Sequence, residues 1–427
     1  MLALSSKNTR LSGMMFLQYA IWGAWLPVTA RYLSATIEEG GLGFSGSQIG
    51  MILGLAGSIG AIVSPFIAGQ IADRYFNTER ILAFLVISGG VIKWITALQT
   101  DYTAWLILSI IYSVLYMPTL ALSNSITFSH INNQVNDFPK IRVWGTIGWI
   151  ASSWLFPMIW LQTNLDFQLL PPFVVGNEVS NVTSRLADAL KFSGIISITY
   201  GTYCYLLPQT PPKKNAVENL AFKKAFRLFR LPSFFVLVIS SLLISVIHQI
   251  YFLQTGPFLS HIGVLDSQIG PAMTIGQFAE IITMAYLGTF LKRLGFHRLI
   301  TIGILAYAMR YAIFGTVFLP VWIIVLSQGL HGFCYAFFFA AAYIYVDKIA
   351  DHDVRHSAQT VFGIIILGGG PVIGGWLSGF LQLNYTNEGV FDFSIFWYTL
   401  SAIGLITAII FFFLFEEEHE NIKEIQI

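Results

Sequence analysis

The segment Phe138-Pro139-Lys140-Ile141-Arg142-Val143-Trp144-Gly145-Thr146-Ile147-Gly148 places an arginine at the start of an apolar run that extends to about Leu161. Thr146 follows Arg142 by four residues, so the two side chains share one face of a helix. A charged side chain inside a membrane-spanning helix is costly unless a partner or a hydrated cavity compensates it. Arg142 is therefore a candidate functional residue, although its position leaves equally open that it extends toward lipid headgroups.

The composition of the whole chain indicates a membrane protein. Hydrophobic residues make up 55% of its 427 residues and charged residues only 11%, whereas soluble domains carry about 25% charged residues. The formal net charge of +1 argues against a nucleic-acid partner. Cys204 and Cys334 both lie in apolar segments, so we expect neither a disulfide framework nor a cysteine-based metal site. Lys7 and Arg10 precede an apolar run without a small-residue cleavage site, which argues against a cleaved signal peptide.

The apolar residues group into about twelve spans, each near the roughly 20 residues that cross a bilayer. We predict these spans near 11–35, 48–72, 80–99, 103–126, 142–162, 190–207, 234–259, 268–291, 297–318, 321–346, 358–382 and 393–415. Basic residues gather in alternate loops, and the longest of these loops, from Leu207 to Arg230, separates six spans from six. The positive-inside rule then places both termini in the cytoplasm.

An internal repeat supports this division. Ser47-Gln48-Ile49-Gly50 recurs as Ser267-Gln268-Ile269-Gly270, each just before the second span of its half. Two similar halves with a binding site between them are typical of secondary transporters. We therefore predict a six-helix bundle over 1–207, a cytoplasmic loop over 208–232, a second six-helix bundle over 233–415 and a solvated acidic tail over 416–427.

The eighth span contains a candidate proton site. Gln277 and Glu280 are three residues apart and share a helix face. Glu280 is the only carboxylate deep inside a predicted span of the second half. Apolar surroundings favour the uncharged form of a carboxylate, so Glu280 could take up a proton near neutral pH. The alternative is a structural ion pair, with Arg310 as the candidate partner.

Other polar and charged residues occur within the spans. Lys93 and Arg310 occupy related positions in the two halves, and we expect them to pair with carboxylates or to extend outward rather than to bind substrate. The remaining polar residues suggest a hydrated central cavity, although each alone is more typical of a helix–helix hydrogen bond; they are Gln18, Asn124, His248, Gln249, Gln254 and His331. Aromatic residues such as Trp22, Trp25, Trp149 and Tyr335 could stack on a ring-shaped substrate or simply face lipid.

The second span ends in Gly69-Gln70-Ile71-Ala72-Asp73-Arg74, with Arg80 after it. This stretch resembles the loop motif of the major facilitator superfamily, in which the glycine allows close helix packing and the charged residues form a cytoplasmic latch. The alternative is a charged helix end that obeys the positive-inside rule. The matching Lys292-Arg293 lacks the aspartate. We predict a cytoplasmic gate formed by Gly69, Asp73, Arg74 and Arg80.

Taken together, the motifs resemble the nucleoside:proton symporter family of the major facilitator superfamily. The matching stretches are the fifth-span run, Tyr116-Met117-Pro118-Thr119-Leu120, Gln277 with Glu280, and Arg355 with Ser357-Ala358-Gln359. The resemblance implies an all-α membrane protein with twelve transmembrane helices in two six-helix pseudo-repeats, the major facilitator fold. It also implies proton-coupled nucleoside uptake by alternating access, in a bacterial inner membrane. We expect a monomer in the lipid bilayer.

The resemblance also assigns a site. The family's substrate-lining positions fall on Arg142, Thr146, Gln249, Gln277 and Glu280, and we add Trp149, His331 and Tyr335. Glu280 and His331 are the candidates for proton coupling.

Two residues depart from the family pattern. A cavity aspartate of the family falls on Ala336, and a seventh-span asparagine falls on Phe252. These departures leave open a proton-coupled sugar or glycoside transporter. A non-transporting membrane sensor is the alternative from another class. The chain has no phosphate-binding loop, no His-Glu-x-x-His and no Gly-x-Ser-x-Gly, so we expect no enzyme, no metal and no cofactor.

Overall fold

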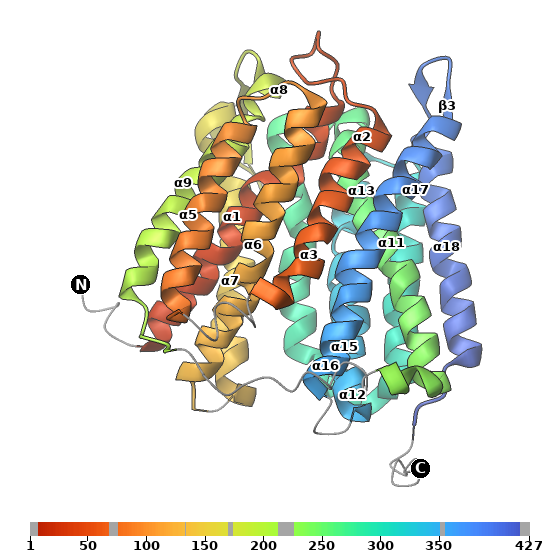
Figure 1. Cartoon of the computed structure of the whole chain (residues 1–427). Coiled ribbons are helices and arrows are strands. Elements are labelled where there is room, and N and C mark those ends of the chain that lie inside the picture. Colours follow the sequence, from red (N-terminus) through yellow and green to blue (C-terminus); the bar gives the residue numbers. More distant parts are fainter. Residues whose placement is uncertain are drawn as a thin grey trace.

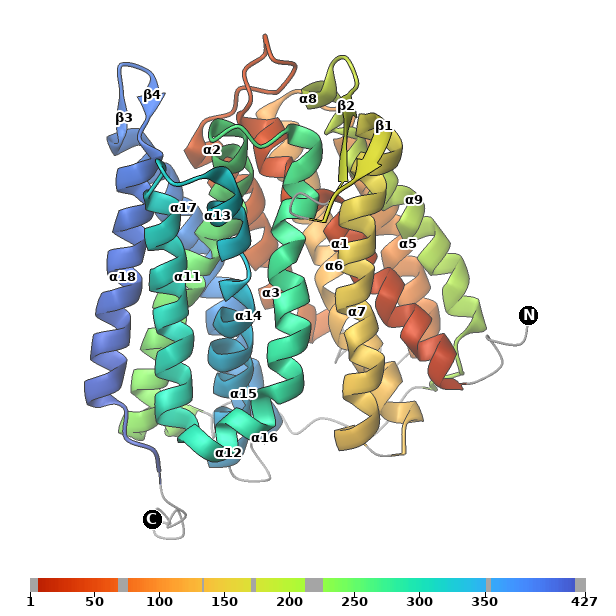
Figure 2. The same cartoon turned by 180° about the vertical axis from the view of Figure 1, so that it is seen from behind.

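The computed structural model describes residues 7–67, 76–132, 134–169, 174–211, 226–350 and 355–418. Long helices lie side by side as an upright bundle, and α1 begins at the same end of the molecule at which α18 ends (Figure 1). Among the described residues, seven helices are long and apolar enough to cross a membrane. Figure 2 shows the same bundle from behind.

The described residues of the first part of the chain form helices and a hairpin, joined by loops. Its elements are α1 (Lys7–Ser34), α2 (Gly46–Gly50), η2 (Met51–Leu55), α3 (Ala56–Phe66), α5 (Thr78–Thr96), α6 (Tyr102–His130), α7 (Gln134–Phe156), η4 (Pro157–Leu161), β1 (Gln162–Phe167), β2 (Val174–Glu178), α8 (Val182–Arg185), α9 (Asp188–Tyr203) and η5 (Cys204–Leu206).

The second part follows the same pattern. Its elements are η6 (Phe226–Arg230), α11 (Pro232–His261), η7 (Asp266–Gln268), α12 (Ile269–Gly315), α13 (Val321–Ser327), α14 (Leu330–Phe333), η8 (Cys334–Ala340), α15 (Ala341–Ile349), α16 (Arg355–Gly363), η9 (Ile364–Gly369), α17 (Gly370–Asn384), β3 (Thr386–Asn387), β4 (Val390–Phe391) and α18 (Phe393–Leu414). The predicted spans 268–291 and 297–318 both overlap α12, which is interrupted at Gly295 between them. Gly295 has a φ of 71°, a conformation that glycine adopts at little cost.

The buried hydrophobic residues form two cores. The first core contains residues between 11 and 207 together with Leu253, and the second contains residues between 234 and 415. The elements of the first core occupy the left of Figure 1 and those of the second core the right. Helices α1, α2, α3 and α7 contact elements of the second core, among them α11, α12 and α17. The surface between the two cores is therefore built from helices of both parts of the chain.

An ion pair and a hydrogen bond to Asp266 join the two cores near the C-terminal end of α1. The Nε of Arg31 donates to Asp266 Oδ1 at 2.9 Å, and its Nη1 donates to Glu39 at 3.0 Å. The Thr183 hydroxyl donates to the other Asp266 oxygen at 3.0 Å. The Asp266 carboxylate connects the first core to the start of α12. We therefore name this group of residues the Asp266 clamp; it consists of Arg31, Glu39, Thr183 and Asp266.

The antiparallel hairpin β1–β2 strengthens the same end of the molecule. Its first residue, Gln162, donates to the Ser267 hydroxyl at 2.7 Å, and its last, Glu178, accepts the Ser267 backbone N–H at 2.8 Å. The sequence predicted no strand here. The hairpin closes on the residue that follows Asp266, so it adds to the connection made by the clamp.

The repeated glycines lie where the two cores meet. A Cβ on Gly50 would collide with the backbone of Gly375 in α17, and a Cβ on Gly270 would lie 2.8 Å from the carbonyl oxygen of Ser153 in α7. Only a residue without a side chain permits such close backbone approach. Each copy of the Ser-Gln-Ile-Gly repeat therefore packs one core tightly against the other.

The prediction of a solvated acidic tail is wrong for Glu417 and Glu418. Glu417 accepts a hydrogen bond from Lys348 at 3.1 Å and from the Phe296 backbone N–H at 3.3 Å. Glu418 accepts one from the Ser233 hydroxyl at 3.0 Å. The break at Gly295 leaves the Phe296 N–H without a helical acceptor, so this N–H can donate to Glu417. Sequence patterns do not reveal this contact. Residues from 419 onward lie outside the described part of the chain.

Candidate functional site

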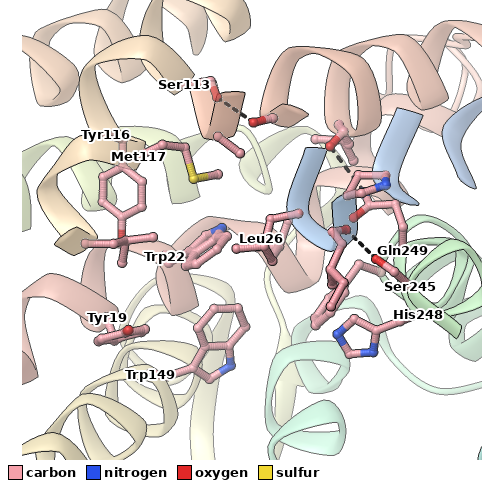
Figure 3. A pocket seen from close by; sticks show the side chains of 18 of the residues that line it. Tyr19, Trp22, Leu26, Ser113, Tyr116, Met117, Trp149, Ser245, His248 and Gln249 are labelled. Atoms are coloured by element: carbon pink, nitrogen blue, oxygen red, sulfur yellow. Dashed lines mark hydrogen bonds between the residues drawn. The ribbon is translucent and has the colours of Figure 1, made fainter. Parts of the chain in front are cut away.

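A cavity of about 450 Å³ lies between the two cores. It falls within the range of about 300–1,000 Å³ that is typical of small-molecule sites. Tyr19, Trp22, Tyr116 and Trp149 lie on one side of it, and Ser245, His248 and Gln249 face them from the other (Figure 3). The cavity wall includes all eight predicted substrate-binding residues, namely Arg142, Thr146, Trp149, Gln249, Gln277, Glu280, His331 and Tyr335.

Two glycines of the fifth-span motif explain why Arg142 faces this cavity. A Cβ on Gly145 would lie 2.6 Å from the Tyr19 ring, and a Cβ on Gly148 would collide with the carbonyl oxygen of Phe16. These glycines let α7 pack closely against α1. The guanidinium carbon of Arg142 consequently lies 4.0 Å from the centre of the Tyr19 ring. Arg142 lines the cavity, and the alternative in which it extends to headgroups does not describe its position.

Arg142 and Glu280 provide opposite charges on the two sides of the cavity. Arg142 comes from α7 and Glu280 from α12, and the two groups interact electrostatically. Within the described residues, neither forms an ion pair at 4 Å or less. Both charged groups therefore remain available to a ligand.

Aromatic rings of the first core form a continuous wall. Trp22 contacts Trp149 at 6.0 Å and Tyr116 at 5.7 Å between ring centres, both edge to face. Tyr116 stacks on Tyr112 at 5.3 Å with an interplanar angle of 12°. Trp149 also meets Phe252 of the second core at 6.4 Å. Such a wall suits a planar aromatic ligand, because stacked and edge-to-face geometries both stabilise ring pairs.

Polar groups of the second core face the wall. The Gln249 amide donates to the Leu53 carbonyl oxygen at 3.2 Å, which connects α11 to η2 (Figure 3). The side-chain oxygen of Gln277 and the indole N–H of Trp149 are buried and have no hydrogen-bond partner among the described residues. Buried polar groups are normally paired, so these two are suited to ligand or water contacts.

His331 belongs to a buried cluster rather than standing alone. Arg310 donates to His331 Nδ1 at 3.0 Å and to the Tyr311 hydroxyl at 3.2 Å. The His331 ring stacks near His248, with centres 5.7 Å apart. Arg310 is fully buried and lies 4.2 Å over the Tyr251 ring. The expectation that Arg310 pairs with a carboxylate or extends outward is wrong for the described structure, because an imidazole nitrogen and phenol rings take the place of an acid.

Lys93 was also expected to pair with a carboxylate or to extend outward, and it does neither within the described residues. Its side chain is 3% exposed, and its ammonium lies 3.2 Å from the centre of the Trp25 ring. Lys93 lies on the cavity wall. Sequence reasoning excluded it from the site, because its aromatic neighbours come from other helices and no local pattern indicates them.

The two departures from the family pattern lie in different surroundings. Phe252 is on the cavity wall, whereas Ala336 is buried in the second core. Of the predicted cytoplasmic gate, Gly69, Asp73 and Arg74 lie outside the described residues. Arg80 is exposed in the first turn of α5. The gate therefore stays a prediction.

Comparison with known proteins agrees with this arrangement. The sequence profile of the family described as "Nucleoside H+ symporter" matches residues 5–420. The YegT protein of Escherichia coli strain K12 is 32% identical, over 98% of this chain and 96% of YegT. The xanthosine permease of the same strain is 29% identical, over 97% of each chain. A crystal structure of a mutant of the nucleoside transporter NupG superposes with a TM-score of 0.83 at 26% identity, covering 96% of this chain and all of that one. The chain therefore belongs to the nucleoside H+ symporter family.

Proposed function

We propose that this protein takes up nucleosides together with protons as a secondary active transporter that works by alternating access. The observation that supports this proposal best is the cavity between the two cores. It combines an aromatic wall, amide groups and two opposite charges on facing helices. A flat base fits the aromatic wall and ribose hydroxyls fit the amides, while the placement between two packed units is that of a transporter site. The family consists of transporters, so the chain is not an enzyme.

Family membership, together with the seven helices among the described residues that are long and apolar enough to cross a membrane, makes the chain a multi-pass membrane protein. We propose twelve spans in two six-helix repeats, in which α12 supplies two spans separated at Gly295. The repeats are 1–207 and 233–415, connected by a loop at 208–232 and followed by the tail 416–427.

We further propose a monomer in the bacterial inner membrane. With both termini in the cytoplasm, the Asp266 clamp closes the outer side, and Gly69, Asp73, Arg74 and Arg80 form a latch on the inner side in the opposite state.

Glu280 is the proposed proton carrier. It lies on the cavity wall without a close ion-pair partner among the described residues, and Arg142 faces it across the cavity. Protonation of Glu280 would remove the negative charge that attracts Arg142, and Arg142 would then interact with the substrate alone. His331 is less suited to this role, because its Nδ1 already accepts a hydrogen bond from Arg310. A proton added there would place two cations side by side, which is unfavourable in a buried site.

The substrate contacts follow from the same geometry. Arg142, Thr146, Gln249 and Gln277 offer donors and acceptors for the ribose and for the base edge, and Trp149 offers a face or an edge to the base ring. His331 and Tyr335 complete the second-core wall. Phe252, where the family has an asparagine, adds ring contact instead of an amide.

The experiment is uptake of radiolabelled uridine and adenosine by proteoliposomes, with and without an inward proton gradient. Wild-type protein is expected to accumulate nucleoside only with the gradient. Glu280→Gln is expected to keep exchange but lose gradient-driven accumulation, whereas the exposed Glu38→Gln serves as a matched control that keeps both. Accumulation that survives in Glu280→Gln would exclude Glu280 as the coupling group.

Competition assays separate the alternatives. Transport that simple sugars inhibit and nucleosides do not would show that the protein is a sugar or glycoside transporter instead. Nucleoside binding without flux in either condition would indicate a sensor.

A further inference from the structure

Lys93 is a cation on the cavity wall that the proposed transport cycle does not use. It lies near the end of α5, and its ammonium contacts the rings of Trp25 at 3.2 Å and Tyr112 at 4.0 Å. Trp25 comes from α1 and Tyr112 from α6, so three helices hold the ammonium. This side chain is therefore placed by tertiary packing toward the interior of the bundle.

Lys93 lacks the partners that the internal arginines Arg142 and Arg310 possess. Arg142 faces Glu280, and the buried Arg310 donates to His331 and Tyr311. Within the described residues, Lys93 forms no ion pair and no hydrogen bond, only its two ring contacts. A buried ammonium without an anion is unfavourable, and ring contacts compensate it only partly. A negative charge brought by a ligand would complete the site.

Two further polar groups adjoin the ammonium. The indole N–H of Trp25 and the hydroxyl of Tyr112 are buried, and neither makes a hydrogen bond of standard geometry among the described residues. Both can donate to an oxygen or to a deprotonated ring nitrogen. Both groups belong to the rings that contact the ammonium, so a charged acceptor that approaches Lys93 can also accept from them.

The aromatic wall connects this subsite to the proposed substrate contacts. Tyr112 stacks on Tyr116, and Tyr116 meets Trp22, which in turn meets Trp149. A ligand ring that packs against this wall can reach Lys93 with one edge. The subsite supplies a single ammonium, whereas a phosphate monoester carries about two negative charges. A singly charged heterocycle therefore fits better than a nucleotide.

We propose that Lys93, Trp25 and Tyr112 form a specificity subsite for the anionic edge of a nucleobase. This transporter then prefers nucleosides whose base is negatively charged at neutral pH over neutral nucleosides of the same size. The inference rests on the proposed function, because it concerns the base-binding end of the same cavity.

The test uses full-length protein purified in detergent and measures displacement of bound radiolabelled uridine. The two competitors are xanthosine, whose base loses a proton near neutral pH, and inosine, which lacks the 2-oxo group and stays neutral. Wild-type protein is expected to bind xanthosine about tenfold or more tightly than inosine, the effect of one charge-assisted hydrogen bond. Lys93→Gln is expected to abolish this preference while inosine affinity changes less than about twofold, and Lys93→Arg is expected to keep it.

Several outcomes would overturn the inference. Equal affinity of the wild-type protein for inosine and xanthosine would already overturn it, before any variant is measured. A preference that persists in Lys93→Gln, or an equal loss of affinity for both competitors, would show that Lys93 acts only in packing. Failure of wild-type protein to bind uridine at all would instead refute the proposed function, and this inference with it.

Discussion

Replacing Asp266 by asparagine should open the end of the molecule that the Asp266 clamp closes. The Asp266 side chain is 6% exposed and that of Arg31 is 16% exposed, so water screens their 2.9 Å contact only weakly. Asparagine keeps the shape of the side chain and can still accept from Thr183 or Arg31, but it removes the charge. The substitution therefore tests the ion pair without creating a cavity.

The magnitude follows from these contacts. A hydrogen bond between charged groups contributes about 1.5–3 kcal/mol and a neutral one about 0.5–1.5 kcal/mol, so the loss is about 1–2 kcal/mol. Arg31 keeps its contact with Glu39, but that carboxylate is 52% exposed and contributes less than about 1 kcal/mol. The cost applies only to the closed state, because the groups are separated and hydrated in the open one. The ratio of closed to open molecules should fall about 5- to 30-fold.

The assay is a spin-label distance measurement across the closed end. Ile37 and Val390 are 79% and 67% exposed and belong to the two different parts of the bundle, so cysteines there accept labels. The native Cys204 and Cys334 are buried and should remain unlabelled. Asp266→Asn is expected to add a population at longer distance that the parent lacks.

A matched control separates this effect from a general loss of charge. Asp188 pairs with Lys191 at 2.7 Å within α9, so Asp188→Asn removes an ion pair that does not cross between the cores. It should leave the distance distribution unchanged. An unchanged distribution in Asp266→Asn as well would refute the reasoning that the clamp holds this end closed.

Two further predictions concern stability. Gly148→Ala should destabilise the protein by about 1–3 kcal/mol, because the added methyl group meets the Phe16 backbone, whereas Gly288→Ala meets nothing within 4 Å and should have little effect; thermal unfolding in detergent compares them. Glu417→Gln should cost less than about 1 kcal/mol, because its Lys348 partner is 41% exposed. A loss of several kcal/mol in the same assay would show that the tail supports the fold more strongly than its contacts indicate.

Local patterns in the sequence were sufficient for the membrane class and for most helix positions. The predicted span 80–99 overlaps α5 (Thr78–Thr96), and 393–415 overlaps α18 (Phe393–Leu414), because apolar length is a local property. The separation of 268–291 from 297–318 corresponds to the break at Gly295 inside α12. The hairpin β1–β2 was missed, because its exposed residues carry little alternating hydrophobicity and it is anchored by Ser267, about 90 residues away.

The sequence by itself determined that this chain is a helical membrane protein of a transporter family, since hydropathy and short motifs depend on neighbouring residues. It also identified eight residues that the fold brings to one cavity. Only the tertiary structure decided what the internal cations contact. Lys93 meets Trp25 and Tyr112, and Arg310 meets His331, across contacts between different helices. Helix packing decides which side chain contacts a buried charged group, and no local stretch of the sequence specifies that packing.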